Sequence, residues 1–182
     1  MKTRFKWISL GILLGAVTLF FLLPSCEKVK DAAKVKVKYA LPDTHFTIDS
    51  LSHLKTEQLL NSVTYTANID SILGANKGTL GNVTFYKLRL TVLSPDWVTL
   101  NWIHSARVTI TPTAGQAVEV AKITSIDPGA RTVDFEISNI DVGANINGPF
   151  EVKVYGDIAG PVPAESINML LESGIEITIN LL

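Results

Sequence analysis

The sequence predicts an all-β protein, an antiparallel β-sandwich of Greek-key or immunoglobulin-like type with one to three short helices. Three observations predict this fold. Apolar and polar residues alternate over many short segments, turn residues separate these segments, and helical patterns are few and short. A closed β-barrel is the alternative architecture, because the same alternation also suits the wall of a barrel.

The first predicted element is an edge strand. Residues 34–41 read KVKVKYAL, and this alternation of lysine with apolar residues indicates a half-buried strand with lysine on its open side. Residues 44–49 continue the same edge after a break at Pro42. Residues 50–61, SLSHLKTEQLLN, instead carry leucine at helical spacing, so we expect a short helix there.

Strand periodicity returns at residues 62–69, SVTYTANI. The glycine-rich residues 74–82 predict a loop, and their spacing does not match a phosphate-binding loop. Residues 83–93 give the strongest strand signal, with a candidate bulge at Phe85 and with Tyr86, Leu88, Leu90 and Val92 facing inward. The stretch Ser94-Pro95-Asp96 then predicts a helix of about two or three turns.

The rest of the chain predicts further strands. They cover residues 106–112, 117–126, 131–137, 150–156 and 175–182. The second and third of these, with a turn between them, form the best hairpin signal in the chain. Residues 165–173 fit a helix and a strand equally well, and that choice stays open.

The N-terminus predicts a secretory signal. Lys2, Arg4 and Lys6 precede the uncharged residues 7–23, which number 17, and no acidic residue lies among the first six. A membrane-spanning helix, which needs about 20 apolar residues, is the alternative that length alone leaves open.

The end of this apolar stretch carries the only cysteine of the chain. Residues 23–26, LPSC, resemble the lipobox of bacterial lipoproteins, in which Leu23 and Ser25 match the family and Pro24 replaces its usual small residue. The resemblance covers residues 1–26 and implies cleavage before Cys26, with the thiol linked to diacylglycerol and the new N-terminus acylated. Several acyl chains would anchor the protein firmly where one would not. An unmodified cysteine is the alternative.

Cleavage would divide the chain into three parts. Residues 1–25 would be the signal peptide, residues 26–38 the lipidated cysteine with a lysine-rich tether, and residues 39–182 a single β-rich domain. The 157 residues that remain after removal of 25 from 182 suffice for one domain. With Cys26 modified, no cysteine is left for a disulfide or for a thiolate metal site.

Charge is distributed unevenly along the mature chain. Residues 27–38 contain five lysines and two acidic residues, whereas the remainder contains eight basic and 15 acidic residues. The lysines would be attracted to anionic headgroups, or they simply solvate a tether. The acidic domain argues against nucleic-acid binding, which usually needs basic surfaces.

We find no catalytic or metal-binding pattern, and we expect no cofactor. The histidines His45, His53 and His104 lack ligand spacing, and no serine-hydrolase or zinc-protease motif is present. The carboxylates of Asp134 and Glu136 alternate with core residues on a predicted strand. Residues 141–148, DVGANING, partly match a calcium loop, but glycine stands at one ligand position and a turn between strands explains the same residues.

Trp97 and Trp102 are the candidate ligand-binding residues. They lie close together in WVTLNWIH, and exposed aromatic rings beside polar groups suit sugars and other amphipathic ligands. The alternative is that at least one of them fills an open end of the sandwich.

The resulting expectation is a lipid-anchored, non-catalytic binding or structural module of a bacterial cell envelope. Its partner would be the membrane, through Cys26, together with a glycan, an envelope protein or a lipid. In well-studied lipoproteins an aspartate after the cysteine marks inner-membrane retention; Glu27 stands there instead, which favours the outer membrane. A carrier of an apolar ligand is the second hypothesis, and an enzyme of unknown type is the third.

Overall fold

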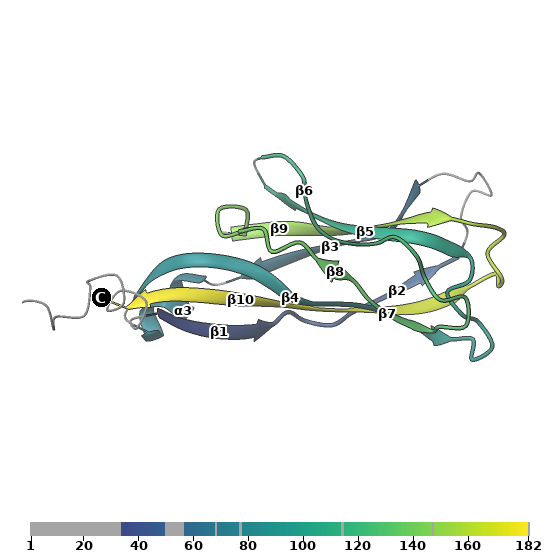
Figure 1. Ribbon diagram of the computed structural model, residues 1–182, viewed down its shortest axis with the longest axis horizontal. Helices are drawn as coiled ribbons and strands as arrows, with labels where there is room; N and C mark the ends of the chain where they lie inside the picture. Colours follow the sequence, from purple (N-terminus) through teal and green to yellow (C-terminus); the bar gives the residue numbers. More distant parts are fainter. Residues whose placement is uncertain are drawn as a thin grey trace, which may run out of the picture. The chain divides into compact units, whose positions relative to one another are not determined.

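The computed structural model describes residues 34–49, 57–67, 69–76, 78–113, 115–146 and 148–181. Within these ranges the chain forms two five-stranded antiparallel sheets and one short helix, stacked as two layers (Figure 1). This confirms the predicted β-sandwich, because the described strands form two separate sheets and not one closed sheet. No helix in the described ranges has the length and apolar character needed to cross a membrane.

The first sheet, called sheet A, is built around the longest strands. Its order is β1 (Lys34–Ala40), β10 (Ile167–Leu181), β4 (Gly78–Ser94) and β7 (Thr132–Asp134), and β2 (Thr44–Ile48) also pairs with β10. β1 and β2 therefore follow each other along one edge of β10, as the sequence predicts. Residues 167–173 of the ambiguous stretch are strand, since β10 begins at Ile167.

The second sheet, called sheet B, has the order β3 (Glu57–Ala67), β9 (Gly148–Ile158), β5 (Ile103–Pro112), β6 (Val118–Ile123) and β8 (Glu136–Ile137). Sheet B has β3 at one edge and the two-residue β8 at the other.

The expected tether overlaps the first strand of sheet A. β1 begins at Lys34, so the last five residues of the tether, 34–38, are strand.

One short segment joins the two sheets at their edges. β7 pairs with β4 in sheet A, and two residues later β8 pairs with β6 in sheet B. Phe135 lies between them, where its backbone N–H donates to the Leu88 carbonyl at 2.9 Å and its ring is buried. The predicted hairpin of residues 117–126 and 131–137 is therefore only partly formed, by the β6–β8 pairs.

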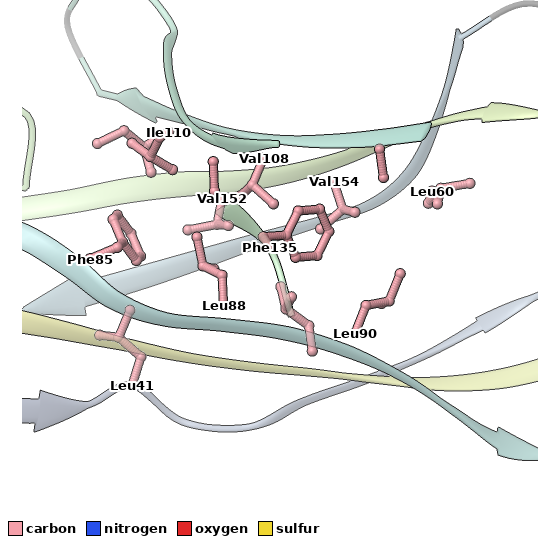
Figure 2. Packing of buried hydrophobic residues seen from close by; sticks show 14 of the residues in the cluster. Leu41, Leu60, Phe85, Leu88, Leu90, Val108, Ile110, Phe135, Val152 and Val154 are labelled. Atoms are coloured by element: carbon pink, nitrogen blue, oxygen red, sulfur yellow. The ribbon is translucent and has the colours of Figure 1, made fainter. Parts of the chain in front are cut away.

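The core fills the space between the sheets. Leu88 and Leu90 of β4 face Val152 and Val154 of β9, with the ring of Phe135 among them (Figure 2). Twelve large side chains of the described residues are less than 2% exposed; they are Leu88, Leu90, Leu100, Ile110, Ile146, Phe150, Ile167, Met169, Leu171, Ile175, Ile177 and Ile179. The alternation read from the sequence thus places most predicted inward residues in one core.

Two predicted helices are wrong over the residues that the structure describes. Residues 57–61 of the helix expected at 50–61 belong to β3, and residues 50–56 lie outside the described residues. A register shift at Leu60 lets this side chain turn inward while Leu59 stays 47% exposed, which explains the adjacent leucines without a helix. After Ser94 the chain makes turns instead of a helix, with Val98 N–H donating to the Pro95 carbonyl at 3.1 Å.

The loop expected at residues 74–82 is also wrong. A helix, α3 (Ile69–Asn76), covers its beginning, and β4 starts at Gly78. A Cβ atom on Gly78 would lie 2.7 Å from the Asn180 carbonyl oxygen, and one on Gly81 2.9 Å from that of Thr178. These glycines therefore allow close strand approach to β10, which the sequence alone does not distinguish from a loop.

The bulge in β4 lies one residue later than predicted. Gly174 pairs with Lys87 and Ile175 pairs with Phe85, so Tyr86 is the extra residue. Val83 and Phe85 face the core before it, and Leu88 does so after it, whereas Tyr86 is only half-buried. At the end of β10, Leu181 is 40% exposed.

Candidate ligand-binding corner

The two candidate tryptophans occupy different environments. Trp97 lies in the turn that follows β4 and is 67% exposed, whereas Trp102, just before β5, is 2% exposed. Trp102 packs into the core together with Val98 and Leu100, as the alternative interpretation has it for at least one tryptophan. The structure therefore leaves Trp97 alone as an exposed aromatic ring in this stretch.

Arg131 holds the turn that carries Trp97. Its guanidinium donates hydrogen bonds to three backbone carbonyls, those of Asp96 at 2.7 Å, Leu93 at 3.0 Å and Val92 at 3.2 Å. The backbone N–H of Val92 in turn donates to the Arg131 carbonyl at 2.8 Å. Residues 93–97, which we call the Trp97 corner, are thus fixed at both ends, which reduces the entropy lost when a ligand binds.

A hollow of about 350 Å³ opens beside the start of this corner, between β2, β10 and β4. We call it the outer hollow. It is lined by His45, Phe46, Thr47, Leu93, Ser94, Asn168 and Met169. Asn168 pairs with Thr47 on one side and with Ser94 on the other, so these three side chains form a row on the outer face of sheet A.

Hydrogen bonds join the members of this row. The Thr47 hydroxyl donates to Asn168 Oδ1 at 2.9 Å, and Asn168 Nδ2 donates to the Ser94 oxygen at 2.8 Å. The Ser94 hydroxyl accepts this bond and keeps a proton to donate to a ligand, and the exposed Leu93 side chain supplies apolar contact. No carboxylate, lysine or arginine lines the hollow among the described residues. This combination suits a neutral ligand with hydroxyl groups.

The remaining sequence candidates have other surroundings. Cys26 and His53 lie outside the described residues, and His104 is exposed on β5. Asp141 Oδ1 accepts the backbone N–H groups of Val83 and Gly143, each at 2.9 Å, so the partial calcium motif forms a turn against β4. In the described part of the chain, no three His, Cys, Asp or Glu residues lie close enough together to hold a metal ion.

Two further hollows lie on sheet B. One, of about 440 Å³, is lined by Thr64, Thr111, Pro112, Thr113, Pro149, Phe150 and Glu151. The other, of about 150 Å³, lies beside the ion pair in which Arg107 donates to both oxygens of Glu57 at 2.5 and 2.7 Å. Arg107 also lies over the Tyr155 ring, 4.3 Å from its centre.

Ion pairs on the outer faces of the two sheets lower the pKa of several carboxyl groups. The hydrogen bond from Arg107 lowers the pKa of Glu57, and that from Arg89 lowers the pKa of Asp134. The pKa of Glu151 is lowered chiefly by Lys153. All three carboxylates stand at the surface, so these pairs indicate strand-to-strand contacts more than catalytic chemistry.

The sequence identifies only Trp97 of this site. Thr47, Ser94 and Asn168 meet because β10 pairs with both β2 and β4, and no local pattern marks residues so far apart in the chain. Their meeting depends on strand order, which the alternation of apolar residues does not reveal.

Comparison with known proteins does not assign the chain to a family. No family model matches the chain, and no curated protein matches it. Solved structures that resemble it include one from desmodium yellow mottle tymovirus, at 15% identity with 82% of this chain and 84% of that chain covered and a TM-score of 0.30. Another is from turnip yellow mosaic virus, at 13% identity with 79% and 93% covered and a TM-score of 0.23. A third is from mud crab tombus-like virus, at 11% identity with 82% and 90% covered and a TM-score of 0.24. These TM-scores are too low to support an argument about fold or function.

Proposed function

We propose that the protein is a lipid-anchored, non-catalytic binding module of a bacterial cell envelope, and that it binds a neutral glycan at the Trp97 corner. The observation that carries the binding proposal is the 67% exposure of Trp97 on a turn that Arg131 fixes. Sugars suit such a ring because their apolar faces stack on it while their hydroxyl groups meet polar neighbours.

The anchor is supported by the leader and by LPSC at residues 23–26. Intact mass of the protein extracted from membranes tests it. We expect a chain that begins at Cys26 and carries diacylglycerol and an acyl group. An unmodified thiol with residues 1–25 still attached would contradict the anchor and, with it, the expected outer-membrane location.

The binding site is tested with immobilised neutral bacterial oligosaccharides. Trp97→Ala is expected to weaken binding about tenfold or more, since it removes an aromatic contact and its buried area. Asn168→Ala tests the outer hollow separately. Leu59→Ala is the matched control, because Leu59 is also an exposed apolar residue but lies on β3 of sheet B. Equal binding by all variants, or no binding by the parent protein, would contradict the proposal.

The packed interior favours surface binding over the hypothesis of a lipid carrier. Side chains from both sheets point into the space between the layers, where an apolar ligand would lie, and form one core cluster there (Figure 2). Native mass spectrometry of the gently purified protein separates the two hypotheses. A stoichiometric lipid mass beyond the acyl groups on Cys26 would favour the carrier.

A further inference from the structure

The outer face of sheet A gathers basic side chains. Lys34, Lys36 and Lys38 occupy alternate positions of β1, and Lys87 and Arg89 occupy alternate positions of β4. Three of these basic side chains form ion pairs with acidic side chains of the same face. Lys36 pairs with Glu176 and Lys87 pairs with Glu172, each at 2.7 Å. Arg89 pairs with Asp134 at 2.6 Å. Counted over the strands alone, five basic and three acidic residues give this face a net charge of +2.

The outer face of sheet B has the opposite sign. Its acidic residues are Glu57, Glu119, Glu136, Glu151 and Asp157, and its basic residues are Arg107, Lys122 and Lys153. Five acidic and three basic residues give a net charge of −2. The two outer faces therefore differ in charge although the body of the chain is acidic.

Two lysines of β1, Lys36 and Lys38, are exposed to a partner. The Lys36 side chain is 68% exposed in spite of its bond to Glu176, so water screens the ion pair. Lys38 reaches across β10 to the Tyr86 ring, with its Nζ atom 4.9 Å from the ring centre. This contact holds the Lys38 ammonium group on the outer face of the sheet.

The expected anchor would bring this face close to a membrane. Lys34 follows Cys26 by eight residues, which span at most about 28 Å when fully extended. A face tethered at that range has a high effective concentration at the headgroups. Each lysine near an anionic surface contributes attraction that falls off within about 10 Å.

We infer that the outer face of sheet A lies against anionic phospholipid headgroups of the membrane that holds the Cys26 anchor. The inference rests on the proposed function, because the anchor supplies the proximity. Charge complementarity selects the face, since sheet B would be repelled by the same headgroups. The outer hollow opens on this same face, at Asn168. A polar ligand bound in the hollow would therefore lie at the membrane surface.

Thiol labelling of the full-length lipidated protein in vesicles tests the inference. Thr178→Cys places a thiol on the outer face of sheet A, and Thr64→Cys places one on the outer face of sheet B. A membrane-impermeant maleimide should label Thr178→Cys several-fold more slowly in phosphatidylglycerol-containing vesicles than in pure phosphatidylcholine. High salt should restore the rate. Thr64→Cys should label equally in both vesicles.

Charge reversal supplies the matched control. Lys36→Glu with Lys38→Glu should abolish the protection of Thr178→Cys, whereas Lys122→Glu with Lys153→Glu on sheet B should retain it. Circular dichroism checks that each variant keeps its strand signal. Equal labelling of Thr178→Cys in both vesicles, or equal protection of Thr64→Cys, would overturn the inference while the anchor stands. Failure of the protein to float with pure phosphatidylcholine vesicles would overturn the anchor and the inference together.

Discussion

Gly174 shows how one residue can set the surface of a sheet. It stands opposite the β4 bulge, and a Cβ atom added to it would lie 2.6 Å from the Tyr86 ring. The ring therefore covers the space that a side chain on β10 would otherwise occupy, and Lys38 lies over the ring in turn. The bulge places the Tyr86 side chain on the outer face of sheet A.

Gly174→Ala should lower the free energy of unfolding by about 1–3 kcal/mol, the range observed when a packed site is overfilled. Urea denaturation measures the change. Gly160→Ala is the control, because a Cβ atom there meets no atom within 4 Å. If the clash with Tyr86 is the cause, Tyr86→Ala should remove most of the cost of Gly174→Ala in a double-mutant cycle. An unchanged cost in the Tyr86→Ala background would contradict this account.

The Glu57–Arg107 pair predicts a dependence of stability on pH. Hydrogen bonding to Arg107 lowers the pKa of Glu57 in the folded protein, so the unfolded chain binds a proton more readily than the folded one. The stabilisation from this pair is present above the unfolded pKa of Glu, about 4.3. It is lost as the pH falls through the lower pKa of the folded state.

Glu57→Gln should therefore destabilise the protein slightly at neutral pH, and this cost should shrink at an acid pH below the unfolded pKa of Glu, about 4.3, as the carboxyl group becomes protonated. The effect is small, since both partners are partly exposed. Urea midpoints at the two pH values measure it. Glu165→Gln is the control, because the described residues show no ion pair for Glu165. A difference of the same size at both pH values would show that the ionised Glu57–Arg107 pair is not its cause.

At the scale of elements, the sequence predicts strands better than it predicts their connections. Residues 83–93 and 150–156 are identified because one face of each strand is buried, which imposes a period of two. The helix predicted over residues 50–61 is wrong over 57–61, because pairing with β9 outweighs the local leucine spacing. The loop predicted at 74–82 is wrong because glycine serves both loops and closely packed strands.

The candidate site follows the same rule. Exposure of one tryptophan and burial of the other could not be separated from sequence, because both lie in one irregular segment. The row of Thr47, Asn168 and Ser94 is a product of strand order. Local patterns therefore predict elements, whereas sites built across strands need the fold.

The segment that crosses between the sheets should be sensitive to loss of its central ring. Phe135 is 6% exposed and packs between β4 and β9, while its neighbours pair with different sheets. Phe135→Ala should lower the free energy of unfolding by about 3–5 kcal/mol, the cost of a large cavity in a core. Ile140→Ala, at an exposed position nearby in sequence, should change it by less than about 0.5 kcal/mol. Similar costs for the two substitutions would show that Phe135 does not join the sheets.

At the scale of the molecule, the two sheets share one core and should unfold together. The core cluster contains residues from β3, β5 and β9 of sheet B and from β4 and β10 of sheet A. Neither sheet can keep its inner face buried without the other. Trp102 belongs to this cluster, so its fluorescence reports on the core, whereas that of Trp97 reports on the surface.

Trp97→Phe therefore yields a protein in which Trp102 is the one tryptophan of residues 26–182. Its emission should be blue-shifted and resist quenching by acrylamide, because Trp102 is 2% exposed. On addition of urea, the Trp102 emission and the circular dichroism of the strands should change with the same midpoint, as one cooperative transition requires. An emission that shifts at lower urea than the strand signal would mean that the Trp102 end of the sandwich opens before the sheets separate. Since the Trp97 corner is built on the same end of β4, such opening would also release the binding site before the fold is lost.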